Sequence, residues 1–335
     1  MRRFRLVLVA AAGAAGLGAA GIAGAATIAY TTLGTSSSHV WVMRSDGSEK
    51  DRLTTGSVVD VAPSLAPAGR RLVFVRRLAS DRDDLFRIGT GGSGLERLTS
   101  TAVAEADPTW APAGGLIAFA AARGPGSSEI VAIEPDGTNR RRLTHNEVDD
   151  IAPTWAPSGS RLAFTRLVGG TNAEIYAVGQ DGEGLRRLTD RRGADHSPDW
   201  SSGGWIAYIR RVANGSELRI VRGDGTGNRP VLRSNRELGA PAWAPDGRRL
   251  VFELWDGVDT ELFLVSRTAP ILRRLTRNDV ADFGPVWAPG GNRIAFTRFT
   301  GGSNDVWTMR PDGSDKTRLT SGSNQQAVSD WGAGP

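Results

Sequence analysis

One short motif recurs along this 335-residue chain at an almost constant spacing. It reads proline, any residue, tryptophan, alanine, proline, with some substitutions in individual copies. The copies begin at Pro108, Pro153, Pro198, Pro241 and Pro285, and an earlier one at Pro63 carries leucine in place of tryptophan. Successive copies are separated by 45, 45, 45, 43 and 44 residues. A repeat of this length is typical of a four-stranded β-propeller blade.

Each repeat also shares an internal order of strands and turns. In one copy, residues 161–166 alternate apolar and polar side chains, and residues 174–178 do so again after a polar loop. The pair Asp181-Gly182 follows, and the repeat ends on Leu188-Thr189. Alternation with a period of two indicates strands with one buried face, and Asp-Gly supplies the positive φ of tight hairpins. Together with the tryptophan segment, this predicts four strands per repeat, named A to D from the axis outward.

The two chain ends hold the parts of one further repeat. Residues 27–32, 39–43 and 52–54 match strands B, C and D, whereas Val328–Trp331 matches strand A with nothing after it. Pairing of the C-terminal strand with the N-terminal strands would close the ring and leave only short outer edges. We therefore predict an all-β, seven-bladed propeller whose closing blade is formed from both chain ends. A six-bladed ring is the alternative.

The first 25 residues have the features of a signal peptide. Arg2, Arg3 and Arg5 precede a long apolar run, and Ala23-Gly24-Ala25 provides the small residues that signal peptidase requires. We expect residues 1–25 to be removed and residues 26–335 to form the propeller, exported to the periplasm, cell envelope or extracellular space. The alternative is an uncleaved anchor, because residues 6–29 carry no charge and are long enough to span a bilayer.

Composition excludes several classes of site. The net charge is +5, but without the three N-terminal arginines 38 basic side chains face 36 acidic ones, which leaves +2. The arginines are scattered over the repeats, so nucleic-acid binding is not expected. The chain contains no cysteine, which rules out disulfides and thiolate metal sites. Its 3 histidines lack the spacing of a zinc site.

The proline–tryptophan motif, the following Ile-Ala-Phe strand and the Leu-Thr ending resemble the WD40-like repeats of the TolB family. The resemblance covers residues 27–331. It implies a propeller fold but specifies function poorly, because such propellers have many roles. A close resemblance to TolB itself would imply six blades and an additional N-terminal α/β domain. The seven repeats of this sequence leave no residues for such a domain. Similar propellers accompany peptidase domains, but the chain has no Gly-x-Ser-x-Gly motif.

Acidic residues recur three positions before the repeat proline. They are Asp60, Glu105, Asp150, Asp195 and Asp282, with Glu237 one position away from the slot that Leu238 occupies and Gln326 in the closing repeat. Their place between strands D and A predicts a ring of carboxylates near one mouth of the channel. Such a ring would attract a cation such as Ca²⁺ or a basic peptide end. Alternatively, each acid bonds turn or backbone amides of the neighbouring blade.

Two other rings have structural interpretations. Arginines end the B strands and acids begin the C strands, which predicts cross-strand salt bridges. The expected pairs are Arg76–Asp84, Arg123–Glu129, Arg166–Glu174, Arg210–Glu217 and Arg298–Asp305. The strand A tryptophans are expected to pack between blades rather than form a carbohydrate-stacking surface, and the remaining tryptophans, Trp41, Trp205, Trp255 and Trp307, are expected mostly in the core.

These observations favour a monomeric, non-catalytic exported propeller that binds a protein or peptide through its channel mouth or a loop face. One alternative is a lactonase- or lyase-like propeller enzyme with a metal at the channel, against which the few histidines argue. Another is a membrane-tethered sensor module, which requires an uncleaved N-terminal segment.

Overall fold

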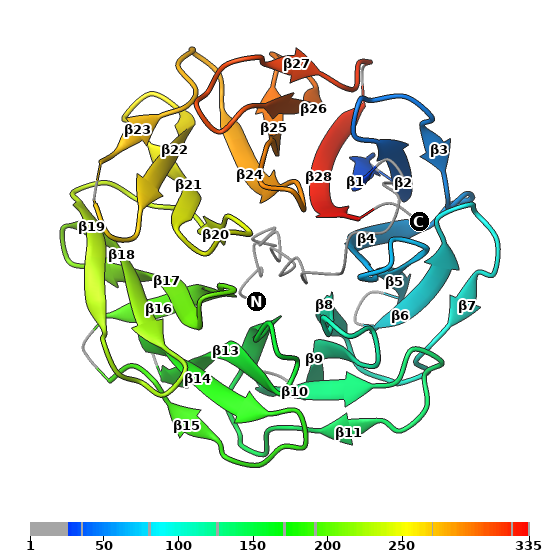
Figure 1. The fold of residues 1–335 in the computed structure, drawn as a ribbon. Helices are drawn as coiled ribbons and strands as arrows, with labels where there is room; N and C mark the ends of the chain where they lie inside the picture. Colours follow the sequence, from blue (N-terminus) through cyan, green and yellow to red (C-terminus); the bar gives the residue numbers. More distant parts are fainter. Residues whose placement is uncertain are drawn as a thin grey trace.

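The computed structural model describes residues 26–34, 36–79, 82–124, 127–169, 172–190, 193–269, 271–322 and 324–333. All regular elements in these ranges are β-strands, and they form a ring of sheets around a central axis (Figure 1). No helix in these ranges is long and apolar enough to cross a membrane. The predicted signal peptide, residues 1–25, lies outside the described ranges.

Within the described ranges, antiparallel ladders group the strands into seven sets of four, which we number as blades 1 to 7. From the axis outward, blade 1 contains β28 (Gln325–Gly332), β1 (Thr27–Leu33), β2 (Ser38–Arg44) and β3 (Asp51–Arg52). Blade 2 contains β4 (Val59–Leu65), β5 (Arg71–Ala79), β6 (Arg82–Gly89) and β7 (Glu96–Arg97). Blade 3 contains β8 (Glu105–Trp110), β9 (Ile117–Gly124), β10 (Ser127–Ile133) and β11 (Arg141–Arg142).

The remaining blades repeat this order. Blade 4 contains β12 (Asp150–Trp155), β13 (Arg161–Gly169), β14 (Asn172–Gly179) and β15 (Arg186–Arg187). Blade 5 contains β16 (Ala194–Trp200), β17 (Trp205–Val212), β18 (Gly215–Arg222) and β19 (Arg229–Ser234). Blade 6 contains β20 (Ala242–Trp243), β21 (Arg249–Trp255), β22 (Thr260–Ser266) and β23 (Arg273–Arg274). Blade 7 contains β24 (Asp282–Trp287), β25 (Ile294–Phe299), β26 (Asn304–Met309) and β27 (Thr317–Arg318).

The chain ends meet in blade 1. Strand β28 pairs antiparallel with β1, from Leu33 opposite Gln325 to Thr27 opposite Gly332. The two strands lie side by side in Figure 1, in red and blue. The predicted all-β propeller with a closing blade built from both ends is confirmed.

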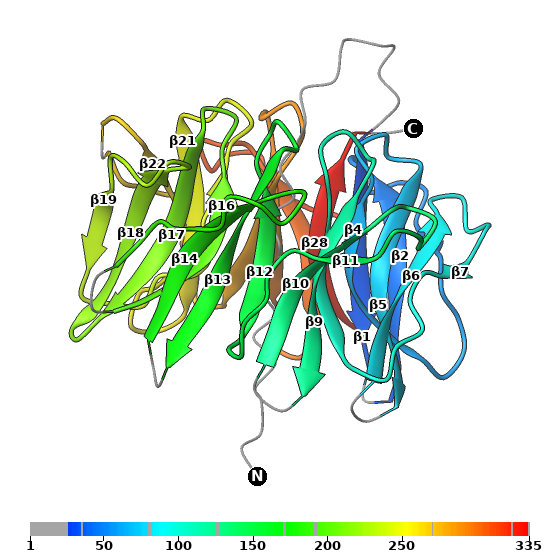
Figure 2. The same ribbon diagram turned by 90° about the horizontal axis from the view of Figure 1, so that it is seen from below.

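Because successive strands of a blade run in opposite directions, the connections alternate between the two faces of the disc. The B–C hairpins and the D–A loops lie on one face, which we call the B–C face. The A–B and C–D turns lie on the other, the A–B face. In Figure 2 the arrowheads of the B strands β9 and β13 point toward the B–C face.

The tryptophans of the A strands connect neighbouring blades. Their exposed fractions are at most 8%. Four indole Nε1 groups donate to a carbonyl of the preceding blade at 3.1–3.2 Å: Trp110 to Ser64, Trp155 to Thr109, Trp243 to Asp199 and Trp287 to Ala242. The prediction of inter-blade packing is confirmed. Of the other tryptophans, Trp255 is 49% exposed, which corrects its expected place in the core.

Candidate functional site

Five acids of the predicted ring lie at the start of an A strand, next to the B–C face. Asp60, Glu105, Asp150, Asp195 and Asp282 belong to β4, β8, β12, β16 and β24 and are at most 1% exposed. Burying a carboxylate so completely is costly unless it is paired and hydrogen-bonded. The partners of these side chains therefore decide what the ring can do.

Four of the five acids form bidentate pairs with an arginine of the adjacent B strand. The pairs are Asp60–Arg76, Asp150–Arg166, Asp195–Arg210 and Asp282–Arg298, with N–O distances of 2.5–2.8 Å. Each guanidinium also stacks on an aromatic ring of its own blade; that of Arg166 lies 4.5 Å from the ring centre of Tyr176. Two parallel bonds and a stacked guanidinium hold each carboxylate rigidly.

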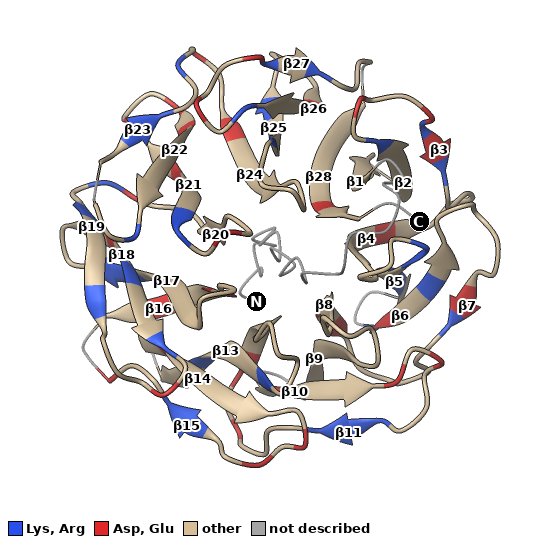
Figure 3. Cartoon of the chain, viewed as in Figure 1, with Lys and Arg blue, Asp and Glu red and all other residues tan. Residues whose placement is uncertain are grey.

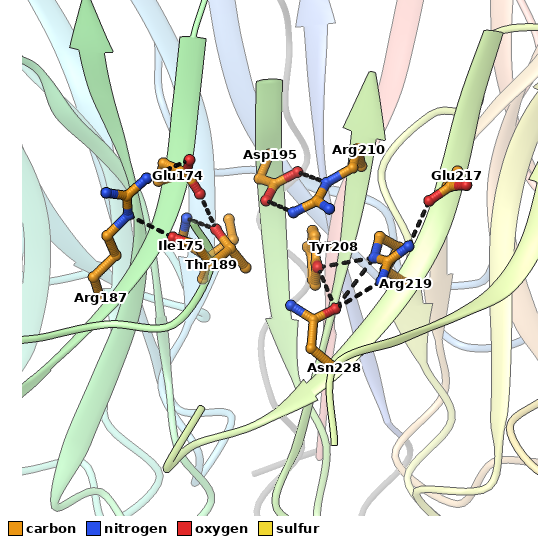
Figure 4. A network of polar contacts seen from close by, with 10 residues as sticks. All are labelled: Glu174, Ile175, Arg187, Thr189, Asp195, Tyr208, Arg210, Glu217, Arg219 and Asn228. Atoms are coloured by element: carbon orange, nitrogen blue, oxygen red, sulfur yellow. Dashed lines mark hydrogen bonds and ion pairs between the residues drawn. The ribbon is translucent and has the colours of Figure 1, made fainter. Parts of the chain in front are cut away.

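This pairing corrects the expected salt bridges between B-strand arginines and C-strand acids. In the ladder, Arg166 lies opposite both Asp150 of strand A and Glu174 of strand C. Its guanidinium bonds Asp150, because a second arginine, Arg187 of strand D, bonds Glu174 at 2.7 Å (Figure 4). Of the predicted pairs, Arg123–Glu129 does form, at 3.3 Å.

Arginines of the D strands bond the C-strand acids in the same way around the ring. The pairs are Asp84–Arg97, Glu174–Arg187, Glu217–Arg233, Glu261–Arg274 and Asp305–Arg318. Glu261 also belongs to this set of C-strand acids, but the sequence did not reveal it. The other acids were recognised from the arginine at the end of the B strand, and in blade 6 Leu254 takes the place of that arginine opposite Glu261.

The Leu-Thr ending of the repeat has a role in this network. In blade 4 the Thr189 hydroxyl accepts the Ile175 backbone amide at 3.0 Å and donates to Glu174 (Figure 4). The equivalent threonine accepts a C-strand amide in five further blades: Thr54, Thr99, Thr144, Thr276 and Thr320. The recurrence of threonine in the sequence signalled this contact, although its partner could not be deduced.

Blade 3 lacks the arginine of the ring. The ladder places Ala121, not Arg123, opposite Glu105. Glu105 is instead bonded by the hydroxyls of Thr99 and Thr101 and lies 3.5 Å from the guanidinium of Arg140. With these weaker partners, burial raises the pKa of Glu105 above its usual value.

Glu237 does not join the other acids. Its side chain is 75% exposed and lies 3.4 Å from Arg211. The slot in the ring belongs to Leu238, which is buried and bridges to Leu254 of strand B. In blade 1 the corresponding residue is Gln326, which is buried opposite Thr32.

The ring therefore consists of five buried acids, most of them already bonded to arginine. Burial raises the pKa of Asp150 and of Asp195, whereas the bonds from Arg166 and Arg210 act in the opposite direction. Binding of a cation or ligand by Asp60, Glu105, Asp150, Asp195 and Asp282 stays a prediction. It would require the arginines to give up their present bonds.

A profile of the TolB beta propeller domain matches residues 23–237 and 203–334. The chain belongs to the TolB β-propeller family. Tol-Pal system protein TolB of Anaeromyxobacter dehalogenans (strain 2CP-C) is 35% identical over 117 residues, 35% of this chain and 26% of that relative. The match thus spans about a quarter of the relative's length.

Solved structures share the fold of this TolB-type propeller. TolB from Acinetobacter baumannii superposes with a TM-score of 0.61 at 17% identity, over 91% of this chain and 66% of that one. An oligogalacturonate lyase from Vibrio parahaemolyticus reaches 0.70 at 11% identity, over 85% and 86%. At such identities the likeness concerns the fold alone, since one propeller architecture carries both kinds of protein.

The B–C face of this TolB-type propeller carries seven exposed apolar side chains, of which the sequence singled out Trp255 alone, as a core residue. They are Leu78, Leu167, Val168, Val212, Trp255, Val258 and Phe299, each 36–80% exposed. All lie in B–C hairpins, distributed over blades 2, 4, 5, 6 and 7. The hairpins have little cover on their outer side because the D strands are short; β7 has 2 residues, whereas β5 has 9.

Proposed function

We propose that this TolB-type propeller is an exported, non-catalytic module that binds a protein or peptide partner on its B–C face. The observation that carries the proposal is the distribution of exposed apolar residues over the B–C hairpins of five blades. Seven of the 11 exposed large apolar side chains in the described ranges lie on this face, and charged residues lie on the outer D strands around them (Figure 3). Apolar groups that gather on one face in this way are characteristic of interaction surfaces. The relative named as a Tol-Pal system protein supports a role in an assembly of proteins.

The channel mouth is the less favoured place for the partner. Asp60, Asp150, Asp195 and Asp282 are buried against arginines, so they present little free charge to a ligand. In this proposal the Arg–Asp pairs position the hairpins. The rigid inner strands then hold the apolar side chains in a fixed arrangement, which lowers the entropic cost of binding.

The test uses the purified full chain, immobilised and incubated with envelope extract from the source cells. Val212 and Phe299, 37% and 40% exposed, are changed together to Asp on the B–C face. The matched control changes Leu95 and Leu185 to Asp as well; these side chains are 48% and 46% exposed. They follow the C–D turns and directly precede the D strands β7 and β15. We expect specific captured proteins to be lost with the first variant and retained with the control. Equal loss with both, or loss with the control alone, would contradict the proposal.

A further inference from the structure

The B–C hairpin of blade 6 carries an acidic cluster, which we call the blade 6 cluster: Asp256, Asp259 and Glu261. An oxygen from each of these carboxylates lies within 4.8 Å of the others. The hairpin connects β21 to β22 on the B–C face, and its neighbouring side chains Trp255 and Val258 are 49% and 80% exposed. The cluster therefore lies next to solvent, and Asn278, which bonds Glu261 through its backbone amide and Asp282 through its side chain, connects it to one acid of the ring.

Several oxygens of the cluster are shielded from solvent but have nothing to bond. The Oε2 atom of Glu261 and both carboxylate oxygens of Asp259 lack a hydrogen-bond partner among the described residues. Glu261 is fully buried, and its other oxygen is held by Arg274 at 2.9 Å and by the Asn278 amide at 2.7 Å. Unpaired buried carboxylate oxygens are strongly unfavourable, so a missing partner is expected at this position.

The charges of the cluster do not balance. Three carboxylates face one guanidinium, that of Arg274, which bonds both Asp256 and Glu261. Counted with Arg274 alone, the cluster has a net charge of −2; the guanidinium of Arg236 lies near Gly257 of the same hairpin, but no ion pair with these acids is found among the described residues. Two other charged groups act on the cluster from blade 7: Asp282, which Arg298 already neutralises, and Lys316, whose Nζ donates to the Gly313 carbonyl.

Comparison with the other blades shows that the excess charge is specific to blade 6. The residue two positions before the C-strand acid is Arg82, Ser127, Asn172, Gly215 or Ser303 in blades 2, 3, 4, 5 and 7. In blade 2 this residue, Arg82, lies 3.7 Å from Asp84 and adds positive charge. In blade 6 it is Asp259, which adds a negative charge instead. The repeat architecture alone does not require an acid here.

We propose that the blade 6 cluster binds one Ca²⁺ ion through carboxylate oxygens of Asp256, Asp259 and Glu261. A divalent cation would neutralise the net charge of −2 and provide the missing partner of the shielded oxygens. Ca²⁺ coordinates oxygens at about 2.3–2.6 Å, so ligands up to about 5 Å apart can share it, whereas Mg²⁺ spans only about 4.2 Å. The backbone amides of Val258 and Asp259 donate to Oδ1 of Asp256, at 3.0 and 3.3 Å, and fold the loop around this position.

The test measures Ca²⁺ binding to the EDTA-treated full chain by calorimetry and by thermal unfolding. We expect one site with an affinity of about 10⁻⁴–10⁻³ M, as in other exported modules, and a rise in Tm of about 2–4 °C at 10 mM Ca²⁺. Mg²⁺ at the same concentration should have less effect. No binding, or an equal response to both ions, would overturn the proposal.

The decisive variant is Asp259→Asn, because it has two distinct consequences. Without Ca²⁺ it should melt at a higher temperature than the wild type, since it relieves repulsion with Asp256 and Glu261. Its Tm should no longer respond to Ca²⁺. The matched control is Asp83→Asn, which removes one charge from the B–C hairpin of blade 2 and should retain the Ca²⁺ response. A Ca²⁺ response that persists in Asp259→Asn would place the ion elsewhere and refute the assignment.

Discussion

The Oδ2 atom of Asp330 accepts a hydrogen bond from the backbone amide of Leu65 at 2.8 Å. This bond joins the last strand of the chain, β28 in blade 1, to strand β4 of blade 2. An equivalent bond joins blades 5 and 6, where Asp199 accepts the Trp243 amide at 2.7 Å. The C-terminal strand therefore completes its own blade and also holds the next one.

Removal of residues 328–335 should destabilise the whole ring. The deletion removes the C-terminal five of the 8 residues of β28, including the buried side chains of Val328 and Trp331. It also removes the bond to Leu65 and leaves an unpaired edge on β1. We therefore expect the free energy of unfolding to fall by several kcal/mol and the Tm to fall by more than about 10 °C. Thermal unfolding measures the effect, and a deletion of residues 333–335 alone is the control. A Tm equal to that of the wild type would disprove this account of closure.

The two buried aspartates predict a specific pH dependence. Burial raises the pKa of Asp330 to about 6 and that of Asp199 to about 7. Each therefore binds its proton more tightly in the folded than in the unfolded chain, where the pKa is near 3.8. Their stabilising contribution is fully present below about pH 4 and is lost as the pH rises through 6 and 7. For Asp330, the difference between a pKa of about 6 and the ordinary value of 3.8 corresponds to a loss of at most about 3 kcal/mol in the free energy of unfolding, since one pKa unit is worth about 1.4 kcal/mol.

Chemical unfolding between pH 4 and 8 tests this dependence. The variants Asp330→Asn and Asp199→Asn should each reduce the fall in the free energy of unfolding over this window. Asp136→Asn is the control, because Asp136 is exposed and bonds to Thr138 lower its pKa, so it titrates below this range. Identical pH profiles for the wild type and both buried-site variants would show that these groups ionise normally.

Export predicts a processed N-terminus. If signal peptidase cleaves after Ala25, protein recovered outside the cytoplasm should begin at Ala26, as intact mass measurement will show. Ala25→Leu should slow the cleavage because the enzyme requires a small residue at this position, whereas Ile22→Leu, outside the Ala-x-Ala positions, should not. A full-length chain found in the membrane fraction would instead support the anchored alternative.

The sequence predicted the fold well because one inter-blade contact recurs in four of the repeats. The spacing of the tryptophans corresponds to the indole bond between blades, such as that from Trp155 to the Thr109 carbonyl. The partner of each ring acid was harder to predict. Arg166 lies opposite two acids in the same ladder, and its choice depends on Arg187, which approaches from a strand of only two residues. The blade 6 cluster escaped prediction because Asp256-Gly257 also reads as an ordinary turn.

Blade 6 suggests a direct test of what the Arg–Asp pairs contribute. In blade 6 the positions of the pair are occupied by Leu238, which precedes β20, and Leu254 of β21, and these two residues form an isolated β-bridge. Changing Arg166 alone to Leu should leave the buried Asp150 without a charged partner, bonded only by neutral groups such as the Asn146 side-chain amide at 2.7 Å, and should cost about 3–5 kcal/mol. Changing both Asp150 and Arg166 to Leu should restore most of that stability, because an apolar pair carries no desolvation penalty.

Urea unfolding of the single and double variants measures this coupling. A double variant as unstable as Arg166→Leu would mean that the pair has a role that leucine cannot replace, for example in orienting the hairpin above it. Capture of partner proteins by the double variant then separates the two roles. If the pairs serve only to position the B–C hairpins, a stable double variant should still bind through Val212 and Phe299. Loss of capture despite normal stability would instead indicate that the acidic ring itself contacts the partner.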